Sequence, residues 1–416
     1  MTEGAGSAVA GAKDVTVALD PTKTFQRMDG FGGCFNELGW TALNCLSPDA
    51  RRGVLKELFD PSGANFTFCR MPIGANDYAL SWYSLDDTPG DYELNHFSMA
   101  RDEVFLIPYI RAAMEFQPGL RIWGSPWSPP AWLKTSGTYN GGSLKSDDRS
   151  LSTYAAYLSR YVREYRQRGI HVVALHMQNE PTVSSVYPSC PMDPSLFIKF
   201  IGRYLGPRFA RDKPGAAIWL GTMNTDLSFV TRILDDKRAS SFIAGAGFQW
   251  HGQTAIEAVH ARYPTLPLMQ TENECGNGSD NWADAAHTWG LIHYYIVHGA
   301  GSYMYWNMVL DSTGSSTWDW RQNAMISISR HEQAVQYNPE FYVMKHLSAF
   351  VKHDAVMIGT NDSPDALAFC NPDGSIVVVA GNFSGGAENL HLTLNGKSYG
   401  VALPDSSVMT ATVPES

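Results

Sequence analysis

Two glutamates directly follow apolar runs of the kind that form buried strands, and their side chains are the ones best placed to do chemistry. Glu180 ends the run at 172–180, and Glu272 ends the run at 266–272. Two carboxylates that face each other across a cleft can hydrolyse a glycosidic bond, because one protonates the leaving oxygen while the other attacks the anomeric carbon or activates water. Burial and mutual repulsion separate the pKa values of two such groups, as these different roles require.

Each of these glutamates also has a plainer interpretation. A strand-end glutamate can merely cap the following helix, and the motif Asn179-Glu180-Pro181 is short enough to occur by chance. Glu274 lies two residues after Glu272, so in a strand both side chains would point the same way. Glu272 is the favoured member, because it directly ends the apolar run, whereas Glu274 already belongs to the loop.

Eight short apolar runs alternate with longer helical stretches, and this pattern predicts an α/β fold, a (β/α)8 TIM barrel. Catalytic side chains of such barrels lie at the C-terminal ends of the strands. Glu180 and Glu272 would end the fourth and seventh strands and face each other across the barrel. The predicted strands cover residues 30–35, 65–74, 120–127, 172–180, 217–224, 245–251, 266–272 and 302–308, and the clearest helices cover 47–59, 100–116, 150–169 and 194–210.

The two ends of the chain differ from the barrel region, which we place at 29–352. Residues 1–12 are small and polar and are predicted to be disordered, and 13–28 carry the alternation of a half-buried strand. The segment 353–416 is all-β, with a Pro-Asp-Gly turn and a second turn at Asn395-Gly396. We expect both termini to build one small all-β side sandwich, because isolated hairpins are only marginally stable.

The composition of the chain limits the kinds of partner that it can bind. The chain of 416 residues has a formal net charge of -10 and no basic run, which argues against nucleic acid or an anionic membrane as a partner. No apolar run reaches transmembrane length and the N-terminus does not read as a signal peptide, so a soluble protein is expected, whether secreted or cytoplasmic. The six cysteines form no C-x-x-C pair, which predicts no metal site, and a disulfide involving Cys190 is left open. The oligomeric state is not encoded in any recognisable pattern.

Several motifs in a fixed order make the sequence resemble glycoside hydrolase family 30, which includes glucosylceramidases and microbial endo-β-1,6-glucanases. The resemblance runs from residue 29 to about residue 350, and its most specific stretch is S-P-W-S-P-P-A-W-L-K. The motifs are Gly30-Phe31-Gly32-Gly33 with Glu37, Arg70-Met71-Pro72 leading to Asp77 and Tyr78, Ser125 to Lys134, Asn179-Glu180-Pro181, Gln270-Thr271-Glu272 and Tyr305-Trp306-Asn307.

The resemblance implies a retaining double displacement, with Glu180 as acid/base and Glu272 as nucleophile, and no cofactor. The two carboxyl groups would then lie about 5–5.5 Å apart. Asn179 resembles the contact to the sugar 2-OH, and Trp127 and Trp306 resemble walls of the same subsite. A carbohydrate, either a β-glucoside or a β-glucan, is the implied substrate.

Four further residues at the mouth are candidate substrate-binding or supporting groups. Asp77 follows the second predicted strand, and Glu37 stands where the family places an Asp that grips outer hydroxyls of the glucosyl ring. Arg70 would hold Glu272 ionised, or form a purely structural ion pair. Trp250 and His251 follow a strand where relatives often carry a Tyr that touches the nucleophile; His251 either fills that role or is a packed neutral histidine.

Substrate specificity stays open between a β-glucosidase or glucosylceramidase-like enzyme and a β-1,6-glucanase. The loops on the aglycone side contain Tyr187, Trp318 and Trp320 but no broad apolar surface of the kind a ceramide demands, which favours a soluble β-glucoside or β-1,6-glucan. A β-xylosidase-type specificity is a weaker alternative. A catalytically silent carbohydrate-binding barrel is the alternative from another class, and the presence of both Glu180 and Glu272 argues against it.

Overall fold

Eight parallel strands curl into a barrel at the centre of the computed structural model, which describes residues 11–413. Nearly all of the segment predicted to be disordered, 1–12, therefore lies outside the described residues. Hydrogen bonds from Gly301 N to Leu268 O (2.8 Å) and from Asn273 N to Met304 O (3.0 Å) join the first and last strands of the sheet. The strands, in sheet order, are β10 (Ser302–Asn307), β3 (Gly30–Cys34), β4 (Phe68–Ile73), β5 (Arg121–Pro126), β6 (Val172–His176), β7 (Ala217–Met223), β8 (Ile243–Gln249) and β9 (Leu268–Glu272).

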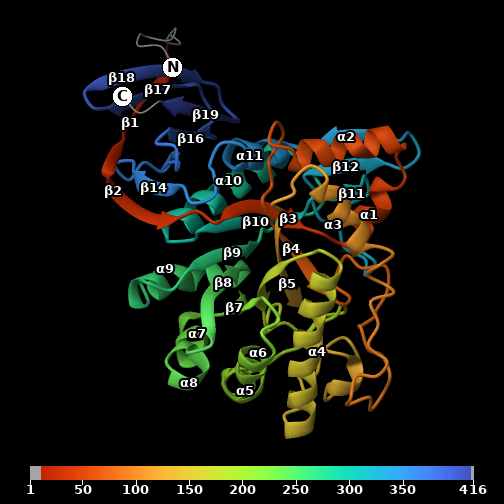
Figure 1. Cartoon of the computed structure of the whole chain (residues 1–416). Coiled ribbons are helices and arrows are strands. Elements are labelled where there is room, and N and C mark those ends of the chain that lie inside the picture. The colour runs from red at the N-terminus through yellow and green to blue at the C-terminus, as the bar shows by residue number, and fades with distance from the viewer. Residues whose placement is uncertain (1–10, 414–416) are drawn as a thin grey trace.

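Helices surround this barrel, as Figure 1 shows. Ser47 and Asp147 cap α2 and α4 through side-chain oxygens that accept from backbone N–H groups, which satisfies donors that the first turn leaves unpaired. The helices are α1 (Glu37–Leu43), α2 (Pro48–Phe59), α3 (Leu106–Met114), α4 (Asp148–Gln167), α5 (Pro194–Phe200), α6 (Gly206–Asp212), α7 (Leu227–Leu234), α8 (Lys237–Ser240), α9 (Gln253–Arg262), α10 (Trp282–Val297) and α11 (Pro339–Ser348).

All eight predicted barrel strands are present, but two predicted helices differ, and proline explains both differences. The helix predicted at 100–116 begins only at Leu106, which places Pro108 in the first turn, where its missing N–H removes no hydrogen bond. The helix predicted at 194–210 is interrupted by a π-helical turn at Ile201–Leu205, just before Pro207. Proline cannot donate to the preceding turn, and the wider turn accommodates that loss.

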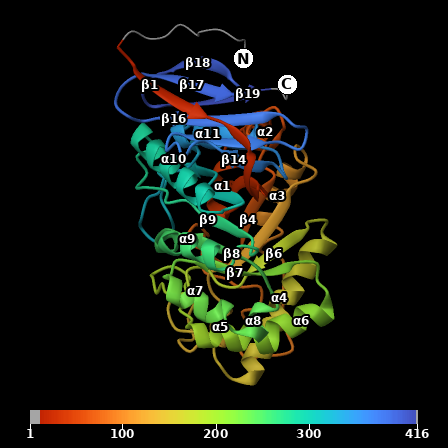
Figure 2. The same cartoon turned by 90° about the vertical axis from the view of Figure 1, so that its left-hand side faces the viewer.

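Strands from both ends of the chain form the side sandwich, as the sequence predicted. Its first sheet joins β1 to the C-terminal strands, and its second sheet carries β2 at one edge. Figure 2 shows this sandwich at one end of the molecule, above α10 and α11. The strands are β1 (Lys13–Ala18), β17 (Glu388–Leu394) and β18 (Lys397–Leu403) in one sheet, and β19 (Ser407–Val413), β16 (Ile376–Asn382), β15 (Ala366–Cys370), β14 (Val356–Gly359) and β2 (Asp20–Arg27) in the other.

The sandwich has its own apolar core, which includes Val17, Val378 and Leu392. Both predicted turns join antiparallel strands, β15 to β16 and β17 to β18. Asn395 and Gly396 both have positive φ, which is the geometry that an Asn-Gly hairpin turn requires.

One small sheet has no counterpart in the sequence prediction. It consists of β11 (Val309–Asp311), β12 (Ile326–Ser329) and β13 (Ala334–Tyr337), and it begins two residues after the last barrel strand. Its strands hold both ends of the loop at 312–325, which lies over the barrel mouth. All six cysteines, Cys190 included, lie in the described part of the chain as free thiols. Within residues 11–413, no helix has the length and apolar character needed to cross a membrane.

Candidate active site

Glu272 is the last residue of β9, and its carboxylate is held by two donors. Arg70 Nη1 lies 2.7 Å from Glu272 Oε2, and Trp250 Nε1 donates to Glu272 Oε1 over 3.0 Å. Both Arg70 and Glu272 are buried. The ion pair and the second donor fix the position of both carboxylate oxygens, as an attacking oxygen requires.

Arg70 organises the centre of the site from β4. Its guanidinium also donates to Ser125 Oγ (3.0 Å) and to the Asn179 side-chain oxygen (2.7 Å). The faces of three tryptophan rings surround it, with Trp127 closest at 4.3 Å from the ring centroid. Hydrogen bonds thus fix the planar guanidinium at its N–H groups, and cation–π contacts with the tryptophan rings fix it further.

Glu180 has a different environment, although it faces the same mouth. It follows β6, and its backbone N–H bonds to Thr222 O on β7 over 3.1 Å. The Tyr187 hydroxyl donates to its side chain over 3.3 Å, and no cation pairs with it among the described residues. Burial, and secondarily the charge of Glu272, raise the pKa of Glu180, so this carboxyl group holds its proton.

Glu180 and Trp250 both adopt left-handed backbone conformations, with φ of 44° and 49°. Such values are uncommon for residues other than glycine, and they cluster at functional sites. At Trp250 the conformation ends β8 abruptly and sends the indole N–H toward Glu272. The strained backbone positions are therefore Glu180 itself and Trp250, the residue that donates to Glu272.

Asp77 adds a third carboxyl group to the cluster. It follows β4, is buried, and one of its side-chain oxygens has no hydrogen-bond partner. Burial, followed by the charge of Glu272, raises its pKa well above the usual range. Ionisation of Glu180 would act in the same direction, so Asp77 is electrostatically linked to both glutamates.

Asn179 is oriented by its side-chain oxygen. That oxygen accepts from Arg70 Nη2, from Thr222 Oγ1 at 2.8 Å and from Gln249 Nε2 at 3.3 Å. With the oxygen fixed by three donors, the amide orientation is determined, and the side-chain NH2 group remains available to a ligand. This geometry suits the contact to a sugar hydroxyl that the sequence predicted.

Trp127 and Trp306 lie together at the same mouth, with ring centroids 5.1 Å apart and planes tilted by 31°. Trp306 belongs to β10, and Trp127 directly follows β5. Both rings are buried, and both contact Arg70. The structure thus brings Arg70, Asp77, Trp127, Asn179, Glu180, Trp250, Glu272 and Trp306 into one cluster.

Glu37 has partners other than those the sequence suggested. It lies at the start of α1, and its carboxylate accepts hydrogen bonds from Nε and Nη2 of Arg101, each at 2.8 Å. Leu80 N also donates to this carboxylate at 2.8 Å. Both of its oxygens are thus engaged by protein groups. The longer side chain that replaces the Asp expected here reaches the loop after β4, and Asp77 on that loop is the carboxyl group that joins the cluster.

His251 is not packed in the interior, and of the two residues that follow β8 it is Trp250 that donates to Glu272. Its side chain is exposed, because the 3-10 turn at Trp250–Gly252 directs Trp250 inward instead. Glu274 also points away from the cluster, since it pairs with His287 at 2.9 Å. The contacts therefore single out Glu272 from its neighbour.

Three supporting residues were not identified from the sequence as part of this site: Thr222, Gln249 and Arg101. Gln249 bonds to Asn179 and accepts from Thr271 Oγ1 (2.8 Å), so it links the strands of both glutamates. Tyr187 was expected only on the aglycone side and proves to contact Glu180. Thr222 and Gln249 could have been predicted as site residues, because they lie at the C-terminal ends of β7 and β8.

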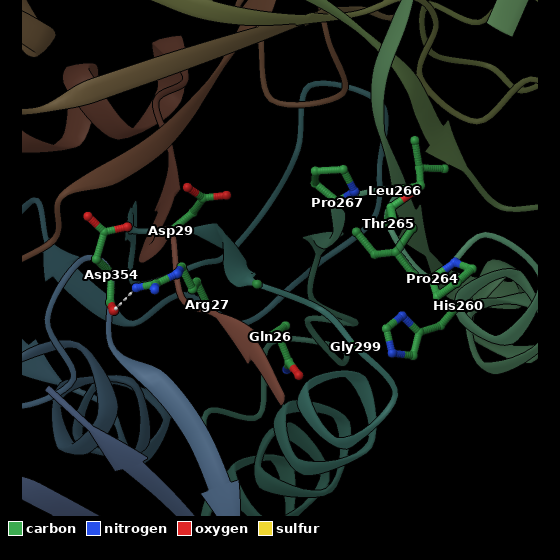
Figure 3. A pocket seen from close by; sticks show the side chains of 12 residues that line it. Gln26, Arg27, Asp29, His260, Pro264, Thr265, Leu266, Pro267, Gly299 and Asp354 are labelled. Atoms are coloured by element: carbon green, nitrogen blue, oxygen red, sulfur yellow. Dashed lines mark hydrogen bonds between the residues drawn. The ribbon is translucent and has the colours of Figure 1, made fainter. Parts of the chain in front are cut away.

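A hollow of about 300 Å³ lies at the opposite end of the barrel, where β9 begins (Figure 3). His260 and Asp29 line it, together with Arg27, which donates to Asp354 O. Asp354 lines it as well, but in this barrel class the N-terminal face serves stability. Catalytic chemistry is therefore assigned to the mouth with the glutamates. No cluster of His, Cys, Asp or Glu between residues 11 and 413 is arranged to hold a metal ion.

Comparison with known proteins gives matches along nearly the whole chain. The model of the glycosyl hydrolase family 30 TIM-barrel domain matches residues 28–351, and that of the family's beta sandwich domain matches 354–411. Putative glucosylceramidase 1 of Caenorhabditis elegans is 29% identical over 394 residues, covering 87% of this chain and 75% of that protein. Endo-1,6-beta-D-glucanase neg1 of Aspergillus fumigatus is 26% identical over 436 residues, covering 94% and 85%. The crystal structure of SrfJ from Salmonella typhimurium superposes with a TM-score of 0.88 at 26% identity, covering 100% of this chain and 95% of that one.

Proposed function

Since the chain belongs to glycosyl hydrolase family 30 and is a glycosidase, we propose that it hydrolyses β-glucosidic bonds by a retaining double displacement. The observation that carries this proposal is the unequal environment of the two glutamates. Arg70 and Trp250 bind Glu272, whereas Glu180 is buried beside that negative charge without a cation of its own. One carboxyl group is thereby ionised and the other protonated in the resting enzyme.

In the first step, Glu272 attacks the anomeric carbon while the bond to the leaving oxygen breaks. Glu180 gives its proton to that oxygen, and a covalent glycosyl ester forms on Glu272. The ester carries no charge, so one of the causes that raise the pKa of Glu180 disappears. Glu180 then takes a proton from water, which attacks the ester and releases the sugar with its original β configuration.

The glycone side of the site is proposed to consist of Asn179, Trp127, Trp306 and Asp77. Asn179 offers its side-chain NH2 group to the 2-OH, a contact that strengthens in the transition state. The two buried tryptophans pack against each other and against Arg70, and so border the glycone side. A β-glucoside is favoured as substrate class, because similar proteins carry the names putative glucosylceramidase and endo-1,6-beta-D-glucanase, which refer to glucosyl substrates.

The test is hydrolysis of an aryl β-glucoside by the wild type, Glu180→Gln and Glu272→Gln, with the product anomers followed by NMR. The β-anomer should form first, and each substitution should abolish its formation. An α-anomer formed first would overturn double displacement, and full activity of Glu272→Gln would transfer the nucleophile role to Glu274. An aryl β-xyloside measured in parallel tests the weaker alternative, since preference for it would replace the β-glucoside assignment.

A further inference from the structure

Four aromatic side chains from four different loops stand at the barrel mouth beyond the catalytic cluster. Tyr187 and Trp320 form one pair, with ring centroids 5.0 Å apart and planes inclined by 60°. Trp82 and Tyr139 form a second pair, at 6.1 Å. We call Tyr187 and Trp320 the inner pair, because the Tyr187 hydroxyl lies 3.3 Å from Glu180 Oε2.

The inner pair lies on the leaving-group side of the scissile bond. Glu180 protonates the leaving oxygen in the proposed reaction, so a ring that touches its carboxyl group borders the group that departs. The groups assigned to the glycone, Asn179 and Trp127, instead surround Arg70 at the barrel axis. Trp320 is half-buried, so part of its ring remains accessible next to Tyr187.

Two of the loops that carry these rings, those of Tyr139 and Tyr187, are joined to each other by hydrogen bonds within the protein. Lys134 Nζ donates to Tyr139 O (2.7 Å) and to Ser189 O (2.6 Å), and Ser189 N donates to Tyr139 O over 3.0 Å. These bonds join the loop after β5 to the loop after β6, which carries Tyr187. A surface that is ordered in advance loses little conformational entropy when it binds.

The neighbours of the inner pair are mostly polar, which distinguishes between a sugar and a lipid as the leaving group. Val186, with 61% of its surface exposed, is the aliphatic residue beside Tyr187. The remaining exposed residues near them in the sequence are polar or charged: Thr182, Ser184, Ser315, Thr317, Asp319 and Arg321. Two alkyl chains require continuous apolar area, whereas a pyranose has an apolar C–H face edged by hydroxyl groups, which matches aromatic rings within a polar surround.

From this arrangement we propose that Trp320, seated on Tyr187, is the binding platform for a second sugar residue on the leaving-group side, so the substrate is a β-linked gluco-oligosaccharide or glucan chain. The proposal rests on the proposed function, because the sides of the site are defined by the role of Glu180. Trp82 and Tyr139 stand on the loops after β4 and β5, at the same end of the barrel.

The test compares wild type and Trp320→Ala on two substrates that differ only beyond the scissile bond. Methyl β-glucoside has a leaving group too small to cover an indole ring, whereas β-1,6-linked gluco-oligosaccharides of two to four residues reach it. We expect Trp320→Ala to lower kcat/KM on the oligosaccharides about tenfold, and to leave methyl β-glucoside within about twofold. Trp320→Phe should restore most of the loss, and Phe25→Ala, which removes an exposed ring on β2, should change neither substrate.

Equal losses on both substrates would overturn the proposal, and so would unchanged activity on the oligosaccharides. A larger loss on glucosylceramide in phosphatidylcholine vesicles than on the oligosaccharides would assign the platform to a lipid instead. If the wild type cleaves no β-glucoside, the proposed function fails, and binding still tests the platform. Calorimetry with the four-residue β-1,6-glucan should then give about tenfold weaker binding to Trp320→Ala than to wild type, and equal binding would overturn the inference.

Discussion

Arg70 and Glu272 form an ion pair of 2.7 Å in which the arginine is fully buried and the glutamate is 6% exposed. A buried pair of this kind contributes little net stability when intact, but loss of one partner leaves an uncompensated charge in the interior. Because the same guanidinium also positions Asn179, the pair links the nucleophile to the expected 2-OH contact.

Replacement of Arg70 by Gln should therefore reduce both stability and activity. We expect a loss of about 3–5 kcal/mol in the free energy of unfolding, measured by urea denaturation, and a fall in kcat of at least about a hundredfold. Arg52→Gln is the matched control, because Arg52 and Glu115 form an exposed surface pair. That control should stay within about 0.5 kcal/mol of the wild type, and similar losses in both variants would refute the special role of Arg70.

Glu180→Ala should separate the acid and base roles by leaving group. A dinitrophenyl β-glucoside departs without a proton, so its glycosyl-enzyme should still form in the variant, and hydrolysis of that ester should limit turnover. Azide, which needs no base, should restore turnover and give a β-glucosyl azide detectable by NMR. If the azide product has the α configuration, Glu180 is not the acid/base of a retaining enzyme.

The pH dependence should follow the protonation of Glu180. Burial and the charge of Glu272 raise its pKa to about 8, so the acid is present below that value and is lost as pH rises through it. The alkaline limb of kcat/KM should thus lie well above the ordinary carboxyl range. In Glu272→Gln the repelling charge is absent, and the pKa of Glu180, followed by carbon-13 NMR, should fall. An unchanged titration would show that Glu272 does not contribute to the shift.

Trp250→Phe should preserve the ring and remove the donor to Glu272. A hydrogen bond to a charged group contributes about 1.5–3 kcal/mol, so kcat should fall about ten- to a hundredfold with little change in the melting temperature. His251→Ala is the neighbouring control, and we expect wild-type kinetics because that side chain is exposed. A larger fall in kcat for His251→Ala than for Trp250→Phe would instead assign the contact with the nucleophile to His251.

Periodicity and strand-end position were enough to predict the barrel, because each strand is a short apolar run and each run is followed by a helix or a long loop. The side sandwich was likewise predictable, since Asn395-Gly396 specifies its turn through backbone conformation alone. The helix at 194–210 was harder, because Pro207 acts through the hydrogen bonds of the preceding turn and produces a π-helical insertion instead of a helix end.

At the site, the residues that end strands were predictable, whereas their partners were not. Glu180 and Glu272 are identified by position, but the choice between Trp250 and His251 depends on a single left-handed residue that no pattern reveals. Glu37 illustrates the same limit, because its partner Arg101 lies 64 residues away in a loop without regular structure. Side-chain pairing between loops leaves no periodic trace in a sequence.

The division of the N-terminal strands between two sheets has a consequence for the nascent chain. β1 and β2 are synthesised before the barrel strands, yet Val15 pairs with Leu390 and Arg27 pairs with Val356. All eight barrel strands are synthesised before these partners, so the barrel can close while both early strands still lack their neighbours. During that interval Val17 and Leu19 are uncovered and two strand edges are open to other chains, which makes pairing with β14 and β17 the step that protects the protein from aggregation.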